Sequence, residues 1–302
     1  MGTIDAFEKE IGMQPDLVKN FVPQKMLGPK KQARSIFCGT GDSFASSLLA
    51  QAFSMHGARA HDPLDLIKNR RLLSGRDLYL VSISGNTISN IRLAKIHGRA
   101  VAITSQPKSR LAEECGRAIH LKFCSTGVQT AGSSSFLSSA LTCISLVSKV
   151  KVGNASRILQ EARRTAKGIR LHGKVFVLGN LQTFPVAMFC AAKLYEVLGA
   201  DAHYERIEQF SHMGLFSARR GDTVLLFEES SPHSENLVKA LRGCGLAVKR
   251  VGLERGSQLD KVVFLIFVSE LVALYSARRK KLGECFFIEE NGLRKASSSM
   301  IY

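Results

Sequence analysis

The chain has 302 residues, of which 45% are hydrophobic, and its 42 Lys and Arg against 25 Asp and Glu give a net charge of +17. Such a chain can bury the core of one large or two ordinary domains, which excludes an intrinsically disordered protein. The basic residues are dispersed except for a run at 278–281, and neither a zinc-finger spacing nor an RNA-recognition motif accompanies them, so nucleic acid is not an expected partner.

Cysteine usage and the N-terminus indicate a cytoplasmic protein. The seven cysteines include no CxxC pair and most lie in apolar segments, as expected of reduced, buried thiols. The first residues, MGTIDAFEKE, carry acids where a signal peptide has basic and then apolar residues. The most apolar segment, residues 262–273, is interrupted by Ser269 and Glu270 and is too short to span a bilayer, so we expect a core helix or a strand–helix junction there.

Strand-like and helix-like segments alternate from residue 34 onward. Short apolar runs predict strands, which cover residues 35–40, 77–84, 100–105 and 118–123. Between and after them, patterns rich in Ala, Leu and Ser predict helices over residues 43–57, 87–98, 108–116 and 133–151. Strands that alternate with helices at this spacing are typical of parallel α/β layers.

The same order of elements recurs in the second half of the chain. The strand-end glycines Gly39 and Gly179 lie 140 residues apart (179 − 39), and Asp77 and Asp222, which open the second strand of each half, lie 145 apart (222 − 77). Two similar spacings indicate a duplicated α/β unit. Strands are predicted over residues 174–180, 222–231 and 246–253, and helices over 184–199 and 233–243.

The repeat predicts the domain organisation and the fold class. We expect an N-terminal extension over residues 1–30, a first lobe over 31–152, a linker helix over 153–173, and a second lobe with a C-terminal tail over 174–302. Each lobe is expected to be a doubly wound parallel sheet between helical layers. The predicted fold is therefore α/β, with two tandem, flavodoxin-like three-layer sandwiches.

The turn SISGNT at residues 82–87 predicts an anion site. It follows a predicted strand, at the edge of the sheet where open α/β folds bind ligands, and leads into a helix N-terminus whose N–H groups favour an anion. Ser82, Ser84 and Thr87 add hydroxyl donors, and Gly85 lets the backbone approach a phosphate closely. Hydroxyls without a lysine suit a sugar phosphate better than a nucleotide. The alternative is that Ser84 or Thr87 is only an N-cap and Gly85 makes the turn.

The corresponding segment of the second half reads EESSPHSE. It has a proline in place of the glycine and adds two glutamates, and carboxylates repel phosphate. We therefore expect one phosphate site per chain, in the first lobe.

The motifs FCGTGDS, SISGNT and AITSQPKSRLAEECGRAIHL together resemble the sugar isomerase (SIS) domain, in which a Ser-x-Ser-Gly-x-Thr loop holds the substrate phosphate. With its repeat, the chain is similar over about residues 30–302 to double-SIS proteins. These include the isomerase half of glucosamine-6-phosphate synthase, related deaminases, and archaeal phosphoglucose/phosphomannose isomerases. The resemblance implies that Gly39, Thr40 and Ser43 of the first loop, together with Ser133, bind substrate along with the turn.

The resemblance also implies four catalytic residues. The segment KLYEVLG supplies Lys193 and Glu196, at positions where the synthases carry the glutamate that transfers the proton. The segment IEQFSHMG supplies His212, sixteen residues after Glu196 (212 − 196), where the family has a histidine that opens the sugar ring. The segment NGLRKASS resembles the family's C-terminal tail and puts Lys295 at the position of a substrate-contacting lysine.

These residue types suit the isomerisation of an aldose to a ketose. The reaction moves a proton between C2 and C1 through a cis-enediol, so one carboxylate, Glu196, can take the proton and return it. Lys193 lies one turn earlier on the same helix face, where it can tune that carboxylate or stabilise charge on a substrate oxygen. A histidine that titrates near neutral pH suits ring opening, which is the role of His212. Glu205 and Glu208 are rival bases that lie closer to His212 in sequence.

Each of these residues also has a plainer interpretation. A Lys/Glu pair three residues apart on a helix is usually a surface ion pair. His212 could be a packing histidine between Phe210 and Met213, and Lys295 could be ordinary tail charge.

The sequence departs from the family at the sugar end of the expected site. Residues 131–136 read AGSSSF where the synthases and deaminases have Ala-Ser-Thr-Lys-x-Phe, and Gly41 stands where the synthases place a serine. These changes leave the phosphate turn intact, and Ser133, Ser134 and Thr40 could compensate. The sequence contains no glutaminase segment, so glutamine is not the expected nitrogen source.

We therefore expect an aldose–ketose isomerase of a hexose 6-phosphate, or a related aminosugar-phosphate deaminase, that needs no metal or cofactor. Its substrates would be glucose, mannose and fructose 6-phosphates, or the glucosamine/fructose 6-phosphate pair with free ammonia. The resemblance implies a homodimer in which His212 of a neighbouring subunit completes each site. Two alternatives stay open. One is a non-catalytic sugar-phosphate sensor, which AGSSSF favours, and the other is a nucleic-acid-binding regulator, for which the first 30 residues are short.

Overall fold

The computed structural model describes residues 1–301 of the chain, which divide into two compact units, each with one parallel β-sheet. We call them the first-sheet unit and the second-sheet unit. Among the described residues, the first-sheet unit comprises 20–124, 134–150 and 291–301. The second-sheet unit comprises Met1–Lys19, Ser125–Ser133 and Lys151–Glu290. The predicted α/β class with parallel sheets is confirmed.

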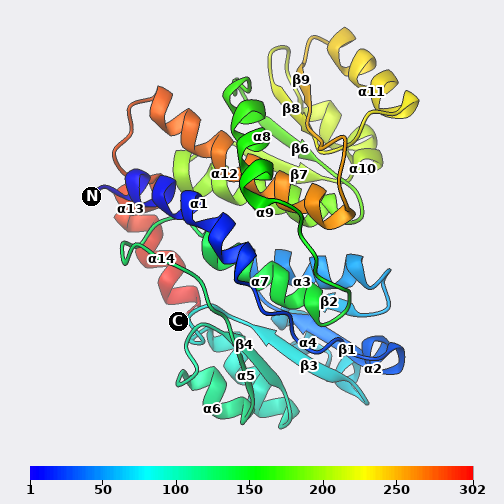
Figure 1. Cartoon of the computed structure of the whole chain (residues 1–302), viewed down its shortest axis with the longest axis vertical. Coiled ribbons are helices and arrows are strands. Elements are labelled where there is room, and N and C mark those ends of the chain that lie inside the picture. Colours follow the sequence, from blue (N-terminus) through cyan, green and yellow to red (C-terminus); the bar gives the residue numbers. More distant parts are fainter. Residues whose placement is uncertain (302) are drawn as a thin grey trace. The chain divides into compact units, whose positions relative to one another are not determined.

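The first sheet has five parallel strands in the order β2-β1-β3-β4-β5. Because the chain moves outward from β1 to β2 and then returns to β3, the strand order reverses between β1 and β3, which lie side by side in Figure 1. This is the flavodoxin-like order, whose ligand site lies at that reversal. The strands are β1 (Ser35–Cys38), β2 (Arg59–His61), β3 (Asp77–Val81), β4 (Val101–Thr104) and β5 (Ala118–His120).

Helices cover both faces of the first sheet. Alternate side chains of β1 and β3 point to opposite faces: Ile36 and Leu80 pack under α4, α5 and α6, whereas Phe37 and Val81 pack under α3 and α7. The unit is therefore a three-layer sandwich. Its helical segments are α2 (Pro29–Arg34), α3 (Asp42–Phe53), α4 (Pro63–Lys68), η1 (Arg70–Leu73), α5 (Ile88–His97), α6 (Arg110–Cys115), α7 (Ser134–Ser145) and α14 (Asn291–Ile301).

The second sheet repeats this arrangement with four parallel strands in the order β7-β6-β8-β9. Its strands are β6 (Val175–Leu178), β7 (Ala202–Glu205), β8 (Thr223–Leu226) and β9 (Ala247–Arg250). The helical segments of the unit are α1 (Thr3–Lys19), α8 (Ala155–Lys167), α9 (Thr183–Leu198), α10 (Ile207–His212), η2 (Gly214–Ser217), α11 (Pro232–Gly243), α12 (Gln258–Arg279) and α13 (Phe286–Glu289).

The two faces of the second sheet carry different helices. Phe176 and Leu226 pack in one hydrophobic cluster with Phe210 of α10 and Val238 of α11, and no residue of α9 belongs to that cluster. Right-handed crossovers put α9 on the other face, since β6→β7 and β7→β8 run in opposite directions across the sheet. Helices α9 and α10 therefore cover opposite faces of this sheet.

The sequence predicted the inner strands and the edge strands β5 and β9, and it missed the edge strands β2 and β7. Strands β1, β3, β4, β5, β6, β8 and β9 lie within the predicted ranges, and each is shorter than its prediction. Strands β2 (Arg59–His61) and β7 (Ala202–Glu205) lie at sheet edges, where one side of the strand has no neighbour. Their segments, RAH and AHYE, contain no apolar run, whereas the edge strands β5 and β9 lie in the more apolar segments AIHLKF and LAVKRVGL.

The structure decides between the two alternatives for residues 262–273 and shortens the helix predicted over residues 133–151. The apolar segment at residues 262–273 lies inside α12, a 22-residue helix that begins with a capping box formed by Ser257 and Asp260. The polar residue Ser269 is accommodated because its hydroxyl donates to the Leu265 carbonyl at 2.7 Å. The helix predicted over residues 133–151 ends at Ser145, as α7. Among residues 1–301, none of the helices is both long and apolar enough to cross a membrane.

The N-terminal residues form part of the second-sheet unit. The sequence analysis did not predict a helix there, yet Thr3–Lys19 form α1, whose Ile4, Phe7 and Ile11 are fully buried. The Gln14 amide donates to the buried Glu270 carboxylate of α12 at 2.8 Å. All seven cysteines are free thiols, and those that are exposed are Cys124 and Cys244.

Candidate active site

The predicted phosphate turn lies at the strand-order reversal of the first sheet. Strands β1 and β3 pair in register from Ser35↔Asp77 to Cys38↔Leu80, so the loop that follows β1 and the turn that follows β3 leave the same edge of the sheet at neighbouring positions. The predicted residues Gly39, Thr40 and Ser43 belong to that loop and the start of α3. The structure thus brings together the two predicted phosphate-binding segments.

Internal hydrogen bonds hold the turn in shape. The Ser82 and Thr87 hydroxyls lie 3.0 Å apart and share a hydrogen bond, and the Gly85 N–H donates to the Ser82 hydroxyl at 3.1 Å. Both hydroxyls are buried. Although Thr87 is the N-cap residue of α5, its side chain does not cap the helix. The N-cap explanation of Thr87 therefore fails, and the pair braces the turn from inside.

The half-buried Ser84 is the residue that presents a hydroxyl at the surface of the turn. Its oxygen accepts a hydrogen bond from the Asn86 N–H at 3.3 Å, so its own O–H is available to donate. The N–H groups in the first turn of α5 have no acceptor within the helix. Together these donors can receive an anion at the helix N-terminus.

Gly85 is required by packing as well as by backbone conformation. Its φ of +64° is in the left-handed region, and a Cβ there would overlap the Ser109 side chain, the N-cap of α6. The Gly85 carbonyl accepts from the Leu111 N–H at 3.0 Å. Helix α6 therefore seals the turn from the side opposite β1.

The loop after β1 is equally constrained. A Cβ at Gly39 would lie 2.7 Å from the Ser43 Cβ, so glycine lets the strand end pack against the first turn of α3. The Ser43 N–H donates to the Thr40 carbonyl at 3.1 Å. The positive φ of Gly41, +54°, gives a backbone conformation that the serine found in the synthases would adopt only with strain.

Residues that the sequence did not point to support the turn from behind. The fully buried Asn90 donates from Nδ2 to the Val81 carbonyl at 3.0 Å, and its Oδ1 is buried without a hydrogen-bond partner among the described residues. The Thr104 and Ser105 hydroxyls, at the end of β4, donate to the Ile83 carbonyl at 3.1 and 2.8 Å. Hydroxyl residues at a neighbouring strand end were the signal that could have revealed this support.

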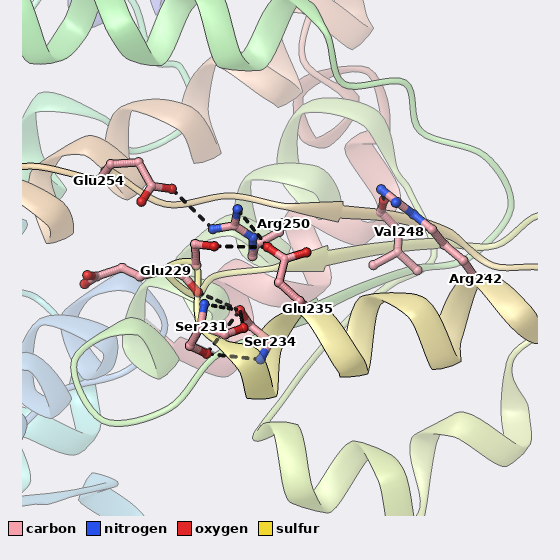
Figure 2. A network of polar contacts seen from close by, with 9 residues as sticks. Glu229, Ser231, Ser234, Glu235, Arg242, Val248, Arg250 and Glu254 are labelled. Carbon is pink, nitrogen blue, oxygen red and sulfur yellow. Dashed lines mark hydrogen bonds and ion pairs between the residues drawn. The ribbon is translucent and has the colours of Figure 1, made fainter.

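The second-sheet counterpart of the turn is closed by its own side chains. Figure 2 shows Ser231 and Ser234 in a reciprocal capping box at the start of α11, with the Ser234 hydroxyl also donating to the Glu229 carbonyl at 2.8 Å. Arg250 forms ion pairs with Glu235 and with Glu254 on either side. This segment uses its hydroxyls as helix caps and carries carboxylates, in contrast to the SISGNT turn.

The predicted catalytic pair Lys193–Glu196 is not an ordinary surface ion pair. The Lys193 side chain is 0% exposed, and its Nζ lies 2.5 Å from Glu196 Oε2 and 4.9 Å from the centre of the Phe189 ring. The Glu196 side chain, in the last turn of α9, is 36% exposed. A buried ammonium needs an anionic partner to offset its lost hydration. The arrangement fixes one carboxylate at the surface and leaves it accessible to a ligand.

His212 is an exposed side chain and not a packing histidine. It is the last residue of α10, and its side chain has no hydrogen bond or ion pair with any residue in 1–301. Since α10 and α9 cover opposite faces of the second sheet, the structure does not bring His212 and Glu196 of one chain together. The rival bases lie nearer to His212: Glu205 ends β7 and Glu208 is exposed on α10.

The two remaining predicted residues differ in environment. Ser133 is fully buried in the second-sheet unit, and its hydroxyl donates to Glu10 of α1 at 2.9 Å. The same carboxylate accepts from the Thr126 N–H at 3.0 Å, so Ser133 belongs to a buried network around Glu10. Lys295 is exposed on α14, a helix without buried residues.

Metal-ligating side chains are not clustered within residues 1–301. No group of three or more His, Cys, Asp and Glu side chains that could hold a metal ion occurs within the described part of the chain. The polar groups at the turn are hydroxyls and amides, which suit an anionic or sugar ligand.

A scan against protein-family models and a search of curated proteins each found no match. Several solved structures are similar to this chain in fold. Glucosamine-6-phosphate deaminase from Thermotoga maritima shares 19% identity, with a TM-score of 0.75 over 93% of this chain and 95% of that one. The C-terminal domain of glucosamine-fructose-6-phosphate aminotransferase from Francisella tularensis shares 16%, with a TM-score of 0.72 over 92% and 98%. Tagatose-6-phosphate ketose/aldose isomerase from Escherichia coli shares 17%, with a TM-score of 0.69 over 91% and 92%. At these identities the likeness shows a shared fold.

The packing of Gly85 predicts a specific loss of stability. Gly85→Ala should lower the free energy of unfolding, measured by urea titration, by at least about 2 kcal/mol, because it combines left-handed strain with overlap on Ser109. Gly98→Ala is the matched control, since Gly98 has a φ of +71° and open space around its Cβ position. It should cost about 1 kcal/mol. Equal losses for the two variants would contradict the role assigned to Ser109.

The burial of Lys193 predicts a strong coupling with Glu196. Glu196→Gln should cost about 3 kcal/mol of unfolding free energy because it takes the charge of a carboxylate away from a fully buried ammonium, whereas Lys193→Met should cost about 1 kcal/mol or less. The double variant should resemble Lys193→Met. A double-mutant cycle on the exposed pair Arg157–Glu161 is the control, and its coupling should be about 0.5 kcal/mol or less. Similar coupling energies in the two cycles would show that Lys193–Glu196 behaves as a surface pair.

Proposed function

We propose that the chain is an aldose–ketose isomerase of a hexose 6-phosphate and a member of the double-SIS family, with the two sheets as its tandem lobes. The observation that carries the proposal is the pair of Lys193 and Glu196. A fully buried lysine holds an accessible carboxylate at 2.5 Å, at the position where the family resemblance puts the proton-transferring glutamate. A surface ion pair would not need a buried partner.

Glu196 would act as the base that moves a proton between C2 and C1. It would take the proton from one carbon to give a cis-enediol and return it to the other, so the same carboxylate would serve in both directions. Lys193 would hold this carboxylate in place through their ion pair, as a positioning residue. Ring opening, which precedes the proton transfer, requires a group that donates to the ring oxygen, and His212 suits it.

The SISGNT turn would hold the 6-phosphate. The Ser84 hydroxyl and the N–H groups of the first turn of α5 would donate to its oxygens, and the Ser82–Thr87 pair would keep the turn in a binding shape before the substrate arrives. Binding energy from the phosphate, which does not react, can then be used to orient C1 and C2.

The proposal includes a homodimer in the cytoplasm. In one chain, His212 and Glu196 lie on helices of opposite faces of the second sheet, which favours a His212 supplied by a neighbouring subunit. Lys295 and Ser133 remain candidates for substrate contacts. The chemistry described requires no metal or cofactor, because proton transfer and ring opening need only acids and bases.

The structures that share the fold support the substrate class. Their names refer to a glucosamine-6-phosphate deaminase, a glucosamine-fructose-6-phosphate aminotransferase domain and a tagatose-6-phosphate ketose/aldose isomerase. These are 6-phosphates of six-carbon sugars. The formation of glucosamine 6-phosphate from fructose 6-phosphate and ammonia, with release of water, would use the same proton transfer between C1 and C2.

A non-catalytic sugar-phosphate sensor is the second candidate. It is favoured by the AGSSSF departure and by the Ser133 hydroxyl, which donates to Glu10. A sensor would bind a hexose 6-phosphate without converting it, and its affinity would not depend on Glu196.

A product assay tests the proposal. The protein is incubated separately with fructose, glucose, mannose and glucosamine 6-phosphates, and with fructose 6-phosphate plus ammonia, and products are followed by NMR. At least one interconversion should occur, and Glu196→Gln should lower its kcat by about 10²- to 10⁴-fold with little change in KM. Ser84→Ala should mainly raise KM.

Glu208→Gln is the matched control, because Glu208 is an exposed glutamate on α10. It should leave kcat within about twofold of the parent protein. Binding of a sugar phosphate without any conversion would establish the sensor instead, and a loss of activity in Glu208→Gln but not in Glu196→Gln would reassign the base.

A further inference from the structure

A cavity of about 520 Å³ lies at the amino ends of β1, β3 and β4, the edge of the first sheet opposite the phosphate turn. Its walls come from the last residue of α2, from η1, from the segment before β3, and from the end of α5. This volume is within the range of small-molecule sites. The proposed isomerase chemistry makes no use of this edge of the sheet.

The cavity is strongly basic. Four arginines line it, together with the single carboxylate of Asp77, so the lining carries three net positive charges (4 − 1) when His97 is neutral. None of these arginines forms an ion pair with any residue in 1–301. They are Arg34, Arg70, Arg76 and Arg99. Concentrated, uncompensated charge of this kind raises the local concentration of anions.

Two of the guanidinium groups are held in place by backbone carbonyls. Arg34 Nε donates to the Gly75 carbonyl at 2.9 Å, and an Arg76 terminal nitrogen donates to the Ala33 carbonyl at 2.6 Å. These bonds join the segments that precede β1 and β3. Each guanidinium has five N–H donors and uses only one of them for its carbonyl bond, so the remaining donors are available to a ligand.

His97 also lines the cavity, and one of its two ring nitrogens lacks a hydrogen-bond partner among the described residues. Its Nε2 lies 3.0 Å from the Arg76 carbonyl, which can only accept, so Nε2 carries the proton. Its Nδ1 is buried and has no hydrogen-bond partner among the described residues. A buried acceptor without a partner is destabilising, and a ligand hydroxyl, or the O–H of a protonated phosphate group, could donate to it.

The helix dipole explains only part of this arrangement. Helices α2 and α5 end at the cavity, and basic residues are favoured at helix C-termini, which accounts for Arg34 and His97. Arg70, however, opens η1 instead of ending it. The dipole also provides no reason for the unpartnered Nδ1 or for the open volume between the arginines.

We propose that this cavity binds a small molecule that carries two or more adjacent phosphate groups. Guanidinium groups match phosphate oxygens in paired hydrogen bonds, and three net positive charges are best matched by an anion of more than one charge. The volume accommodates more than a single orthophosphate. This site is separate from the turn at residues 82–87, so the proposal does not depend on the isomerase activity.

Calorimetric titration of the full chain with inorganic pyrophosphate tests the site. Pyrophosphate should bind at least about tenfold more tightly than orthophosphate at the same ionic strength. Arg70→Gln/Arg99→Gln removes two charges without touching the carbonyl bonds of Arg34 and Arg76, and should weaken pyrophosphate binding by about a hundredfold. Urea titration should show unchanged stability in this variant.

The matched control is Arg92→Gln/Arg117→Gln, which removes the same charge from exposed positions of the same unit. It should change pyrophosphate affinity by less than about threefold. Equal weakening by both double variants would overturn the proposal, since the effect would be one of overall charge. Weakening by Ser84→Ala to the same extent as by Arg70→Gln/Arg99→Gln would also overturn it, because pyrophosphate would then occupy the turn. Duplex DNA that binds with a steep salt dependence through Arg70 and Arg99, where pyrophosphate does not bind, would overturn it in favour of a nucleic-acid surface.

Discussion

The parallel pairing of every strand constrains where this protein can carry chemistry. A parallel connection must cross a face of its sheet, so helices cover both faces and the sheet itself is accessible only at the ends of its strands. The SISGNT turn uses the carboxyl end of β3, and the arginine-lined cavity uses the amino ends of β1 and β3. Glu196 lies in the last turn of α9.

Buried polar contacts mark both candidate positions, whereas the overall distribution of charge in the sequence does not locate them. The buried Lys193 ammonium forms an ion pair with Glu196 on the same helix, α9. The buried Ser82 and Thr87 hydroxyls share a hydrogen bond within the phosphate turn. The buried ammonium of Lys193 is bonded to the accessible Glu196 carboxylate, and the buried Ser82 hydroxyl accepts from the Gly85 N–H within the turn. At both candidate positions, contacts from buried groups therefore hold the accessible ones.

The sequence was sufficient for the inner strands because four consecutive buried residues leave an unmistakable apolar run, as in SIFC and VFVL. It did not reveal the edge strands β2 and β7, because their segments RAH and AHYE contain no apolar run, whereas the edge strands β5 and β9 lie in apolar segments and were predicted. It could not show that Lys193 is buried, because lysine in a helix is normally solvated. Only one of the two requirements for glycine at position 85 was predictable. The turn conformation follows from the sequence, but the contact with Ser109 depends on how α6 packs.

Motif spacing identified the accessible groups, and the structure supplied their partners. The Ser133 network around Glu10 illustrates the limit, because the helix α1 that carries Glu10 was not predicted and lies far from Ser133 in sequence. The basic cavity illustrates another limit, since its arginines are separated in sequence and gather only at the sheet edge.

The central claim is that Glu196 carries a proton between C1 and C2 of a hexose 6-phosphate. Incubation of the protein with fructose 6-phosphate in heavy water, followed by NMR, measures that step whether or not much product accumulates. The account predicts that deuterium enters the sugar at C1 or C2 with the parent protein and that this labelling is lost in Glu196→Gln. Labelling that persists at the parent rate in Glu196→Gln would contradict it.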